Sequence, residues 1–329
     1  TSFEIMREIL DLCGRFGTTL ILISHDINLA AKWCNKVAII DKGLIVEKGK
    51  IIDVFNSPKS NIGKKLVNAS KIVLEPNTKY SFRNDLVLEA NNLRHWYKLN
   101  SSIFRPKWNK ALNEVSFKLY RNETLGIVGP SGSGKSTLCR ALIGLLNVRG
   151  GEIKIYENNL QLKNNKYYKN VKNMQIIFQD PFSSLNPKMT IRNILKDIFL
   201  IQKITDKKRI ETEMRLIFRN LKLPFVNEFL NSYPSQLSGG QLQRVSLARS
   251  LLLKPKILIC DESVNMLDAS VKIEILELLR FIQEKMNLTI IFITHDLGIA
   301  KRFCNRLLVM NYGKIVAEGD ASTIFSKTK

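Results

Sequence analysis

Short apolar runs alternate with helical patterns along most of the chain, which is the arrangement that predicts a parallel α/β sheet. Helical patterns, with apolar residues three and four positions apart, cover residues 3–15, 137–143 and 272–285. Four apolar runs have the length and β-branched content of buried strands: 124–128, 174–178, 256–260 and 289–294. Because parallel strands end at a common edge, polar residues that follow these runs are expected to meet there.

The hydrophobic pattern at the start of the chain is repeated at its end, at an offset of 270 residues. Residues 18–26 (TTLILISHD) align with residues 288–296 (LTIIFITHD), and GLIVEKG from Gly43 aligns with GKIVAEG from Gly313. Each copy predicts an amphipathic helix, an apolar strand ending in Ser/Thr-His-Asp, a second helix and two short strands turned at the glycine. Agreement over this length indicates a duplication.

The two copies differ in what precedes them. No glycine-rich loop stands before the first copy, and the chain starts with Thr1 instead of Met. We therefore expect residues 1–58 to be the closing part of a first domain, in a chain that is a fragment cut within its first repeat. Residues 59–84 are rich in Lys, Asn and Ser and predict a tail and linker that contains a helix. A complete domain is expected over residues 85–329.

Composition and charge narrow the class of protein. Of the 329 residues, 45% are hydrophobic and 24% charged, as in ordinary soluble domains. The five cysteines are scattered, which favours buried thiols in a reducing cytosol, and no run reaches the roughly 18 apolar residues of a spanning helix. The net charge is +22, but Lys and Arg are spread along the chain without a basic block. This favours a solvated basic surface over attraction to anionic lipid, and no nucleic-acid partner is expected.

One glycine-rich segment lies between a strand-like run and a helical one. It reads GPSGSGKS from Gly129, the spacing of a phosphate-binding loop in the context that supports it. Glycines let successive backbone N–H groups surround an anion, and the following helix adds positive charge at its N-terminus. The alternative is a glycine-rich turn that only looks similar. As a phosphate loop, the segment predicts that ATP contacts Gly129, Pro130, Ser131, Gly132, Ser133, Gly134, Lys135, Ser136 and Thr137, with Lys135 on the β- and γ-phosphates and Ser136 on Mg²⁺.

Three further strand ends carry residues suited to nucleotide hydrolysis. Asp261 and Glu262 end the run at 256–260, which is costly unless the carboxylates meet a cation, so we place Asp261 on Mg²⁺ and Glu262 on the attacking water. Gln179 follows the run at 174–178 and could reach Mg²⁺ or that water, although a loop glutamine is more often solvated. His295 ends the run at 289–294; a core histidine is the alternative, but its duplicate at His25 favours a hydrogen bond to the γ-phosphate.

The segment Leu237-Ser238-Gly239-Gly240-Gln241 begins a helix, with Ser238 as its cap and glycines that expose its first amides. These residues match the signature of the ATP-binding-cassette (ABC) superfamily, which the chain resembles over almost its whole length. The resemblance implies a P-loop NTPase (RecA-like) core with an antiparallel β subdomain and an α-helical subdomain at about 182–250. It also implies ATP and Mg²⁺ as ligands, head-to-tail pairing of two cassettes, contact of the signature Ser238–Gln241 with ATP of the paired cassette, and a place for Asp268 in the interface.

Longer segments narrow the resemblance to one subfamily. Residues 178–187, 233–244 and the insert at 98–110 look like the ATPases of dipeptide, oligopeptide and nickel importers, and residues 55–69 look like a worn form of their tail. The resemblance implies an ATP-hydrolysing subunit for uptake of peptides or nickel, with Tyr97 stacked on adenine, although His95 and Trp96 are close alternatives. It further implies permease subunits as partners, a solute-binding protein as an indirect one, and a peripheral position on the cytoplasmic face of a prokaryotic inner membrane.

The chain departs from the superfamily pattern after Glu262, where Ser263, Val264, Asn265 and Met266 replace the usual Pro-Thr-Ser-Ala. This puts coupling between paired sites in question, yet the catalytic residues remain and predict a hydrolytically competent second cassette. A soluble twin-cassette protein acting on ribosomes or in DNA repair is the rival, but residues 59–84 are too short for its long charged linker. An inert binding module conflicts with Glu262 and His295. As given, two complete ATP sites would need two copies of this chain.

Overall fold

The computed structural model describes residues 2–24, 27–71, 85–99, 107–157, 160–162, 173–264, 267 and 269–324. The chain divides into two units. The first consists of Thr1–Val73 with Asp268–Glu274, and the second of Leu74–Leu267 with Ile275–Lys329. Among the described residues, no helix combines the length and the apolar character needed to cross a membrane.

The first unit is built around one antiparallel hairpin of β1 (Lys36–Asp41) and β2 (Leu44–Lys50). Lys42 and Gly43 between the strands have φ of 48° and 81°, the left-handed pair of a type I′ hairpin turn. A small core forms where Ile39, Ile51, Val54 and Val67 are buried. Helices complete the unit: α1 (Ser2–Phe16), α2 (Ile27–Trp33), α3 (Ile51–Asn56) and α4 (Asn61–Lys71).

The strand that the sequence predicts at residues 18–24 does not form, and this expectation is wrong. These residues have no regular structure, and the side chains of Ile21 and Ile23 are 85% and 94% exposed. Their counterpart in the second unit, β10 (Thr289–Ile293), is hydrogen-bonded to a parallel strand on each side. In the described part of the first unit the only strands are those of the hairpin. An apolar pattern supplies strand propensity, but the strand itself requires neighbours to pair with.

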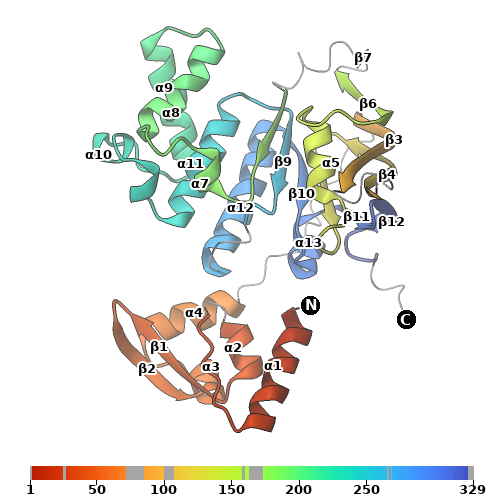
Figure 1. Ribbon diagram of the computed structural model, residues 1–329. Helices are drawn as coiled ribbons and strands as arrows, with labels where there is room; N and C mark the ends of the chain where they lie inside the picture. Colours follow the sequence, from red (N-terminus) through yellow and green to blue (C-terminus); the bar gives the residue numbers. More distant parts are fainter. Residues whose placement is uncertain are drawn as a thin grey trace. The chain divides into compact units, whose positions relative to one another are not determined.

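The second unit contains a six-stranded sheet in the order β12-β11-β5-β10-β9-β8, parallel except for β12. Its inner strands β5 and β10 are buried along their whole length, as expected for a sheet with helices on both faces (Figure 1). The helix predicted at 272–285 is present with wider bounds, and the helix predicted at 137–143 begins two residues earlier and ends one residue earlier than expected. The elements of this layer are β5 (Thr124–Val128), α5 (Lys135–Leu142), β8 (Met174–Ile177), β9 (Ile257–Asp261), β10, α13 (Leu297–Phe303), β11 (Arg306–Asn311), β12 (Lys314–Asp320) and the part of α12 (Ala269–Met286) from Ile275 onward, which is the part that belongs to this unit.

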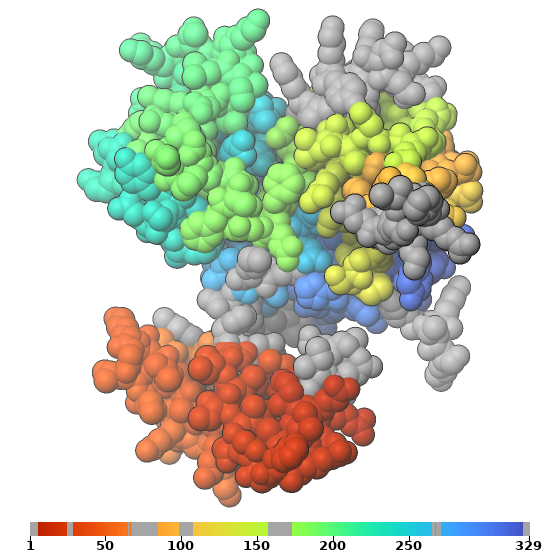
Figure 2. Space-filling view, in the orientation of Figure 1, coloured from red at the N-terminus to blue at the C-terminus, as the bar shows by residue number. Residues whose placement is uncertain are grey.

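An antiparallel sheet and a helical part complete the second unit. The sheet has the order β4-β3-β6-β7, and the helices lie between β8 and β9 in the chain. Figure 2 shows the helical part, green to teal, and the antiparallel sheet, orange to yellow, on opposite sides of the core elements. The elements are β3 (Leu86–Leu99), β4 (Lys107–Tyr120), β6 (Gly150–Glu157), β7 (Leu160–Leu162), α7 (Pro181–Ser184), α8 (Ile191–Ile201), α9 (Lys207–Asn220), α10 (Asn227–Leu230), a 3₁₀ turn (Pro234–Gln236) and α11 (Gly239–Leu251).

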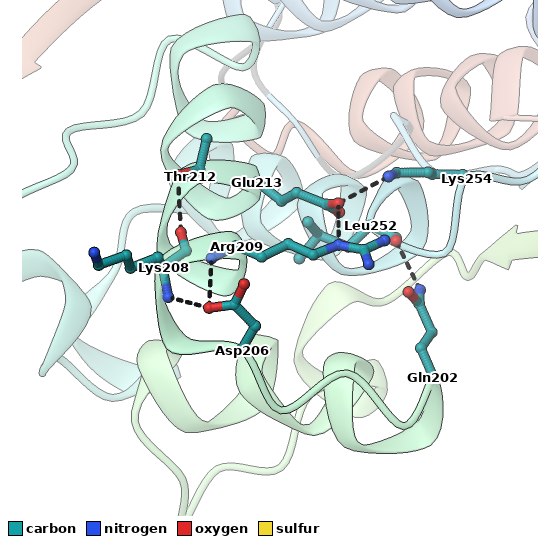
Figure 3. A network of polar contacts seen from close by, with 8 residues as sticks. All are labelled: Gln202, Asp206, Lys208, Arg209, Thr212, Glu213, Leu252 and Lys254. Atoms are coloured by element: carbon teal, nitrogen blue, oxygen red, sulfur yellow. Dashed lines mark hydrogen bonds and ion pairs between the residues drawn. The ribbon is translucent and has the colours of Figure 1, made fainter.

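Polar contacts attach the helical part to the segment that leads into β9 (Figure 3). Glu213 of α9 accepts hydrogen bonds from Arg209 Nε at 3.3 Å and from Lys254 Nζ at 3.0 Å. Burial raises the pKa of Glu213, but the bonds from Lys254 and Arg209 outweigh it, so the pKa of this carboxyl is lowered. Gln202 Nε2, after α8, donates to the carbonyl of Leu252 at 2.9 Å. The bond from Lys254 links α9 to the segment between α11 and β9, and the bond from Gln202 links the end of α8 to the end of α11.

The internal repeat extends to the hydrogen-bond register of the two hairpins. β1 and β2 cover the residues that lie 270 positions before β11 and β12, and α2 is related in the same way to α13. Both hairpins have a register shift at the same place, between Ile39 and Ile40 in one and between Val309 and Met310 in the other. In the second unit, β11 also pairs with β5 on the side away from β12. The described part of the first unit contains no strand that corresponds to β5.

Candidate functional site

The loop after β5 has a backbone that only glycine can follow at two positions. Gly129 has φ 156°, and a Cβ there would lie 2.2 Å from the carbonyl oxygen of Met310. Gly134 caps α5 with φ 105°, and its Cβ would lie 2.2 Å from the carbonyl oxygen of Ala111. The loop is therefore packed closely against the backbones of β11 and β4, and it continues directly into the N-terminus of α5. This is the geometry that favours a bound phosphate.

Lys135, the first residue of α5, is held by its own loop. Its side chain is buried, and Nζ donates to the carbonyl oxygens of Gly129 and Pro130, both at 2.9 Å. Burial lowers the pKa of Lys135, while Glu262 and Asp261 act in the opposite direction. Ser133 lies in the same loop with a buried Oγ that has no hydrogen-bond partner among the described residues. The loop thus presents a fixed cation beside its backbone amides.

The two carboxylates lie at the end of β9. Burial and the neighbouring Glu262 raise the pKa of Asp261, although its hydrogen bond with Ser136 lowers it. Asp261 Oδ1 is buried and lacks a hydrogen-bond partner within the described residues. A buried, unpartnered carboxylate oxygen beside a hydroxyl fits Mg²⁺, which prefers oxygen ligands and keeps several of its sites for water and phosphate. Glu262 has φ 50°, a left-handed conformation that an L residue adopts at a cost and that is common at functional sites.

The raised pKa of Asp261 gives a prediction about stability. At neutral pH the carboxyl is ionised in the unfolded chain, and burial opposes that ionised form in the folded one. We expect Asp261→Asn to raise the Tm of the protein in EDTA by a few degrees at pH 7 while weakening Mg²⁺-dependent ATP binding. The increase in Tm of the variant over the parent should be complete above the raised pKa of Asp261. It should vanish as the pH falls below 3.8, the ordinary pKa of an aspartate. Thermal unfolding of both forms across this pH range is the measurement; an unchanged or lower Tm at pH 7 would contradict it.

His295 lies in the turn between β10 and α13. Its Nδ1 is 3.6 Å from Glu262 Oε1, and its side chain is 65% exposed. The turn is fixed by Asp296, which caps α13 by accepting from the amide of Ile299 at 3.1 Å and donates its own amide to Thr294 Oγ1 at 3.0 Å. The core alternative for His295 is therefore wrong, and the imidazole lies beside the second carboxylate.

A cavity of about 370 Å³ brings several of the predicted residues together. Its lining residues come from β3, β4, the phosphate loop, α5 and the loops after β8 and β9: Tyr97, Asn109, Ala111, Ser131, Gly132, Gly134, Lys135, Ser136, Thr137, Gln179 and Glu262. The lining includes Tyr97 but neither His95 nor Trp96. Asn109 and Ala111 were missed by the sequence reasoning. Asn109 pairs directly with Tyr97 in the β3–β4 ladder, so a strand alignment would have identified it.

The signature residues are placed elsewhere in the second unit. Ser238 caps α11 in a capping box: its Oγ accepts from the Gln241 amide at 3.4 Å, and Gln241 Oε1 accepts from the Ser238 amide at 3.0 Å. Ser238, Gly239, Gly240 and Gln241 are all described, and none of them lines the cavity. Of the departures after Glu262, Ser263 and Val264 are buried. Asp268, Asn265, Met266 and His25 lie outside the described residues.

The comparisons with known proteins agree with this geometry. A profile of the family described as "ABC transporter" matches residues 112–265. The oligopeptide transport ATP-binding protein OppF of Haemophilus influenzae is 40% identical over 76% of this chain and 76% of its own length. The peptidoglycan transport ATP-binding protein YejF of Agrobacterium fabrum is 31% identical over 98% of this chain, which spans 59% of that protein.

Two solved structures share the fold. One is cbiO1 of Clostridium perfringens, part of the ABC transporter complex cbiONQ, with a TM-score of 0.62 and 26% identity over 74% of this chain and 92% of that one. The other is the ATP-binding cassette MJ0796, a dimer in a post-hydrolysis state bound to ADP and Pi. It has a TM-score of 0.60 and 28% identity over 71% of this chain and 98% of its own.

Proposed function

This chain belongs to the ABC transporter family as one of its ATP-binding ATPases, and we propose that it powers peptide uptake through membrane permease subunits. The cavity carries the ATPase part of the proposal, because it brings together the phosphate loop, the Tyr97 ring of β3 and the side chains of Gln179 and Glu262, which follow β8 and β9. The oligopeptide transport names of the relatives support the choice of substrate class. Nickel and related small solutes are the alternative cargo.

In the proposed mechanism, the phosphate-loop amides and Lys135 bind the β- and γ-phosphates, and Tyr97 stacks on the adenine. Glu262 orients a water for in-line attack. His295, whose Nδ1 lies 3.6 Å from Glu262 Oε1, donates a hydrogen bond toward the γ-phosphate. Ser136, Asp261 and Gln179 would hold Mg²⁺, which offsets phosphate charge when bound. Fixed donors aimed at the charge of the transferring phosphoryl group supply most of the rate enhancement.

We also propose that the site is composite. The helix start at Ser238–Gln241 is capped, with Ser238 and Gly239 exposed, and it lies outside the cavity of its own chain. Head-to-tail pairing with a second cassette would bring such a helix start against the phosphates, and Asp268 into the interface. The MJ0796 cassette, which is a dimer bound to ADP and Pi, supports the pairing of two cassettes. Closure of the pair would reach the permease through the segment after Gln179, at the cytoplasmic face of the inner membrane, with a solute-binding protein delivering the cargo.

We further propose that the first unit is the closing part of another cassette, so that the chain is a portion of a twin-cassette protein. The 270-residue register of its hairpin and helix supports this, as does the YejF relative that matches almost the whole chain. In this proposal, residues 18–24 would form a strand only beside a neighbour that corresponds to β5. We expect their amides to exchange with solvent at least about a hundredfold faster than those of β10, which have partners on both sides. Hydrogen-exchange mass spectrometry tests this; equal protection in both segments would contradict it.

Reconstitution tests the transport function. The chain, expressed with the permease subunits and the solute-binding protein of a peptide-uptake system, should co-purify with the permease and hydrolyse ATP faster when peptide-loaded binding protein is added. Binding protein loaded with nickel is the matched control for the cargo. Co-sedimentation with ribosomes instead of the permease would favour the rival function, and the absence of any ATP turnover would contradict the proposal as a whole.

A further inference from the structure

Three aromatic side chains follow one another in β3, and only one of them faces the nucleotide cavity. Tyr97 lines the cavity and is 37% exposed, whereas the preceding Trp96 lies under Lys110, whose Nζ is 5.6 Å from its ring centre. His95, two residues before Tyr97, is on the same face of the strand and is buried. It is thus behind the ring on which the proposed function places adenine.

The imidazole of His95 contacts the Tyr97 ring. The two ring centres are 4.8 Å apart with an interplanar angle of 71°, the T-shaped arrangement that aromatic rings favour. The Nδ1 atom of His95 lies 3.1 Å from the carbonyl oxygen of Asn147. Because a carbonyl only accepts, Nδ1 must carry the proton of this hydrogen bond, which fixes both the tautomer and the plane of the imidazole.

Asn147 belongs to the segment that joins α5 to β6, and this segment is anchored on both sides. The amide of Arg149 donates to the Arg94 carbonyl of β3 at 2.8 Å, and the amide of Leu146 donates to the Arg140 carbonyl of α5 at 3.1 Å. Helix α5 starts at the phosphate loop. His95 therefore connects the Tyr97 ring to the segment that follows α5, the helix whose N-terminus lines the same cavity.

We propose that His95 is a positioning residue that sets the orientation of Tyr97 for adenine. It does so because its imidazole contacts the Tyr97 ring and is itself held by the carbonyl of Asn147, in the segment that follows α5. The proposal rests on the proposed ATP site. An exposed tyrosine can adopt several rotamers, and a fixed neighbouring ring that selects one of them lowers the entropy lost when adenine stacks. His95 itself does not line the cavity, so it acts on the nucleotide through Tyr97.

Variants of His95 separate its two contacts. His95→Asn keeps a donor near Nδ1 but removes the ring, and His95→Phe keeps a ring but removes the donor. We expect each to raise the Kd for Mg-ATP by about 3- to 10-fold, the range of one aromatic pair, with kcat at saturation unchanged. Binding of inorganic tripolyphosphate, which has no base, should not change. Arg94→Gln is the control: it is the adjacent residue, with its side chain paired to Glu114, and it should bind ATP as the parent does.

A double-mutant cycle on Kd decides between positioning and a general structural role. In a Tyr97→Ala background, His95→Asn should have no further effect on ATP affinity, because the ring that it positions is absent. An equal loss in both backgrounds, or a loss of tripolyphosphate affinity, would overturn the proposal. If the parent chain binds no ATP, the proposed function fails first; if Tyr97→Ala weakens binding but His95 acts independently of it, only this inference fails. Thermal unfolding confirms that each variant is folded.

Discussion

Replacing Glu262 by glutamine should stop ATP turnover while leaving ATP bound. The change keeps the size and the Cβ of the side chain, so it does not alter the left-handed backbone at this position, φ 50°. It removes the negative charge that faces the attacking water and the basic oxygen that would accept its proton. Loss of a positioned general base usually costs about 10²- to 10⁴-fold, so kcat should fall at least into that range. Steady-state phosphate release and equilibrium ATP binding are the two measurements.

The matched control for this prediction is Glu284→Gln, the same chemical change at an exposed position of α12. It should leave both measurements unchanged. Removing the charge of Glu262 also removes one of the two carboxylates that support the charge on buried Lys135, so a modest change in ATP affinity in either direction is compatible with the role. Turnover within a few-fold of the parent would contradict this role and would transfer it to another group, for which His295, with Nδ1 3.6 Å from Glu262 Oε1, is a candidate.

The sequence could predict those parts of the site that depend on one segment at a time. The phosphate loop follows one buried strand, Asp261 ends another and Glu262 comes directly after it, and the apolar runs locate those strands almost to the residue. Asn109 and Ala111 required knowledge of how β4 is aligned with β3. That alignment is shifted by irregularities, one of them between His95 and Trp96, which no pattern along a single strand reveals.

The strand expected at residues 18–24 shows a different limit. Its pattern matches that of β10, yet β10 is stabilised by hydrogen bonds to β5 and β9, and no such partner is described for residues 18–24. Local propensity therefore predicts an element only when the tertiary neighbours are present. The same reasoning applies to the signature helix. Its cap and glycines are readable from the sequence, but its distance from the cavity within one chain is a property of the fold.

The composite site predicts that two inactive variants should restore each other. Lys135→Ala removes the cation of the phosphate loop, and we expect at least about a hundredfold loss of turnover. Gly239→Glu places a carboxylate at the start of α11, where it would repel the phosphates of a paired cassette. A Cβ at Gly239 meets only Leu267 Cδ2 at 3.6 Å, an ordinary contact, so the helix should fold normally and Gly239→Ala should remain active. Both single variants should unfold near the Tm of the parent.

Mixed before ATP is added, the two variants should recover activity that neither has alone. In a symmetric head-to-tail pair, a mixed dimer has one site with an intact phosphate loop and an intact signature, while both defects fall in the other site. Random pairing of equal amounts makes about half of the dimers mixed, so the mixture should have about a quarter of the parental number of complete sites. Replacing the Gly239→Glu partner by the double variant is the control, and it should give no recovery. Absence of recovery in the first mixture, with an active parent, would show that the signature completing each site comes from within the same chain.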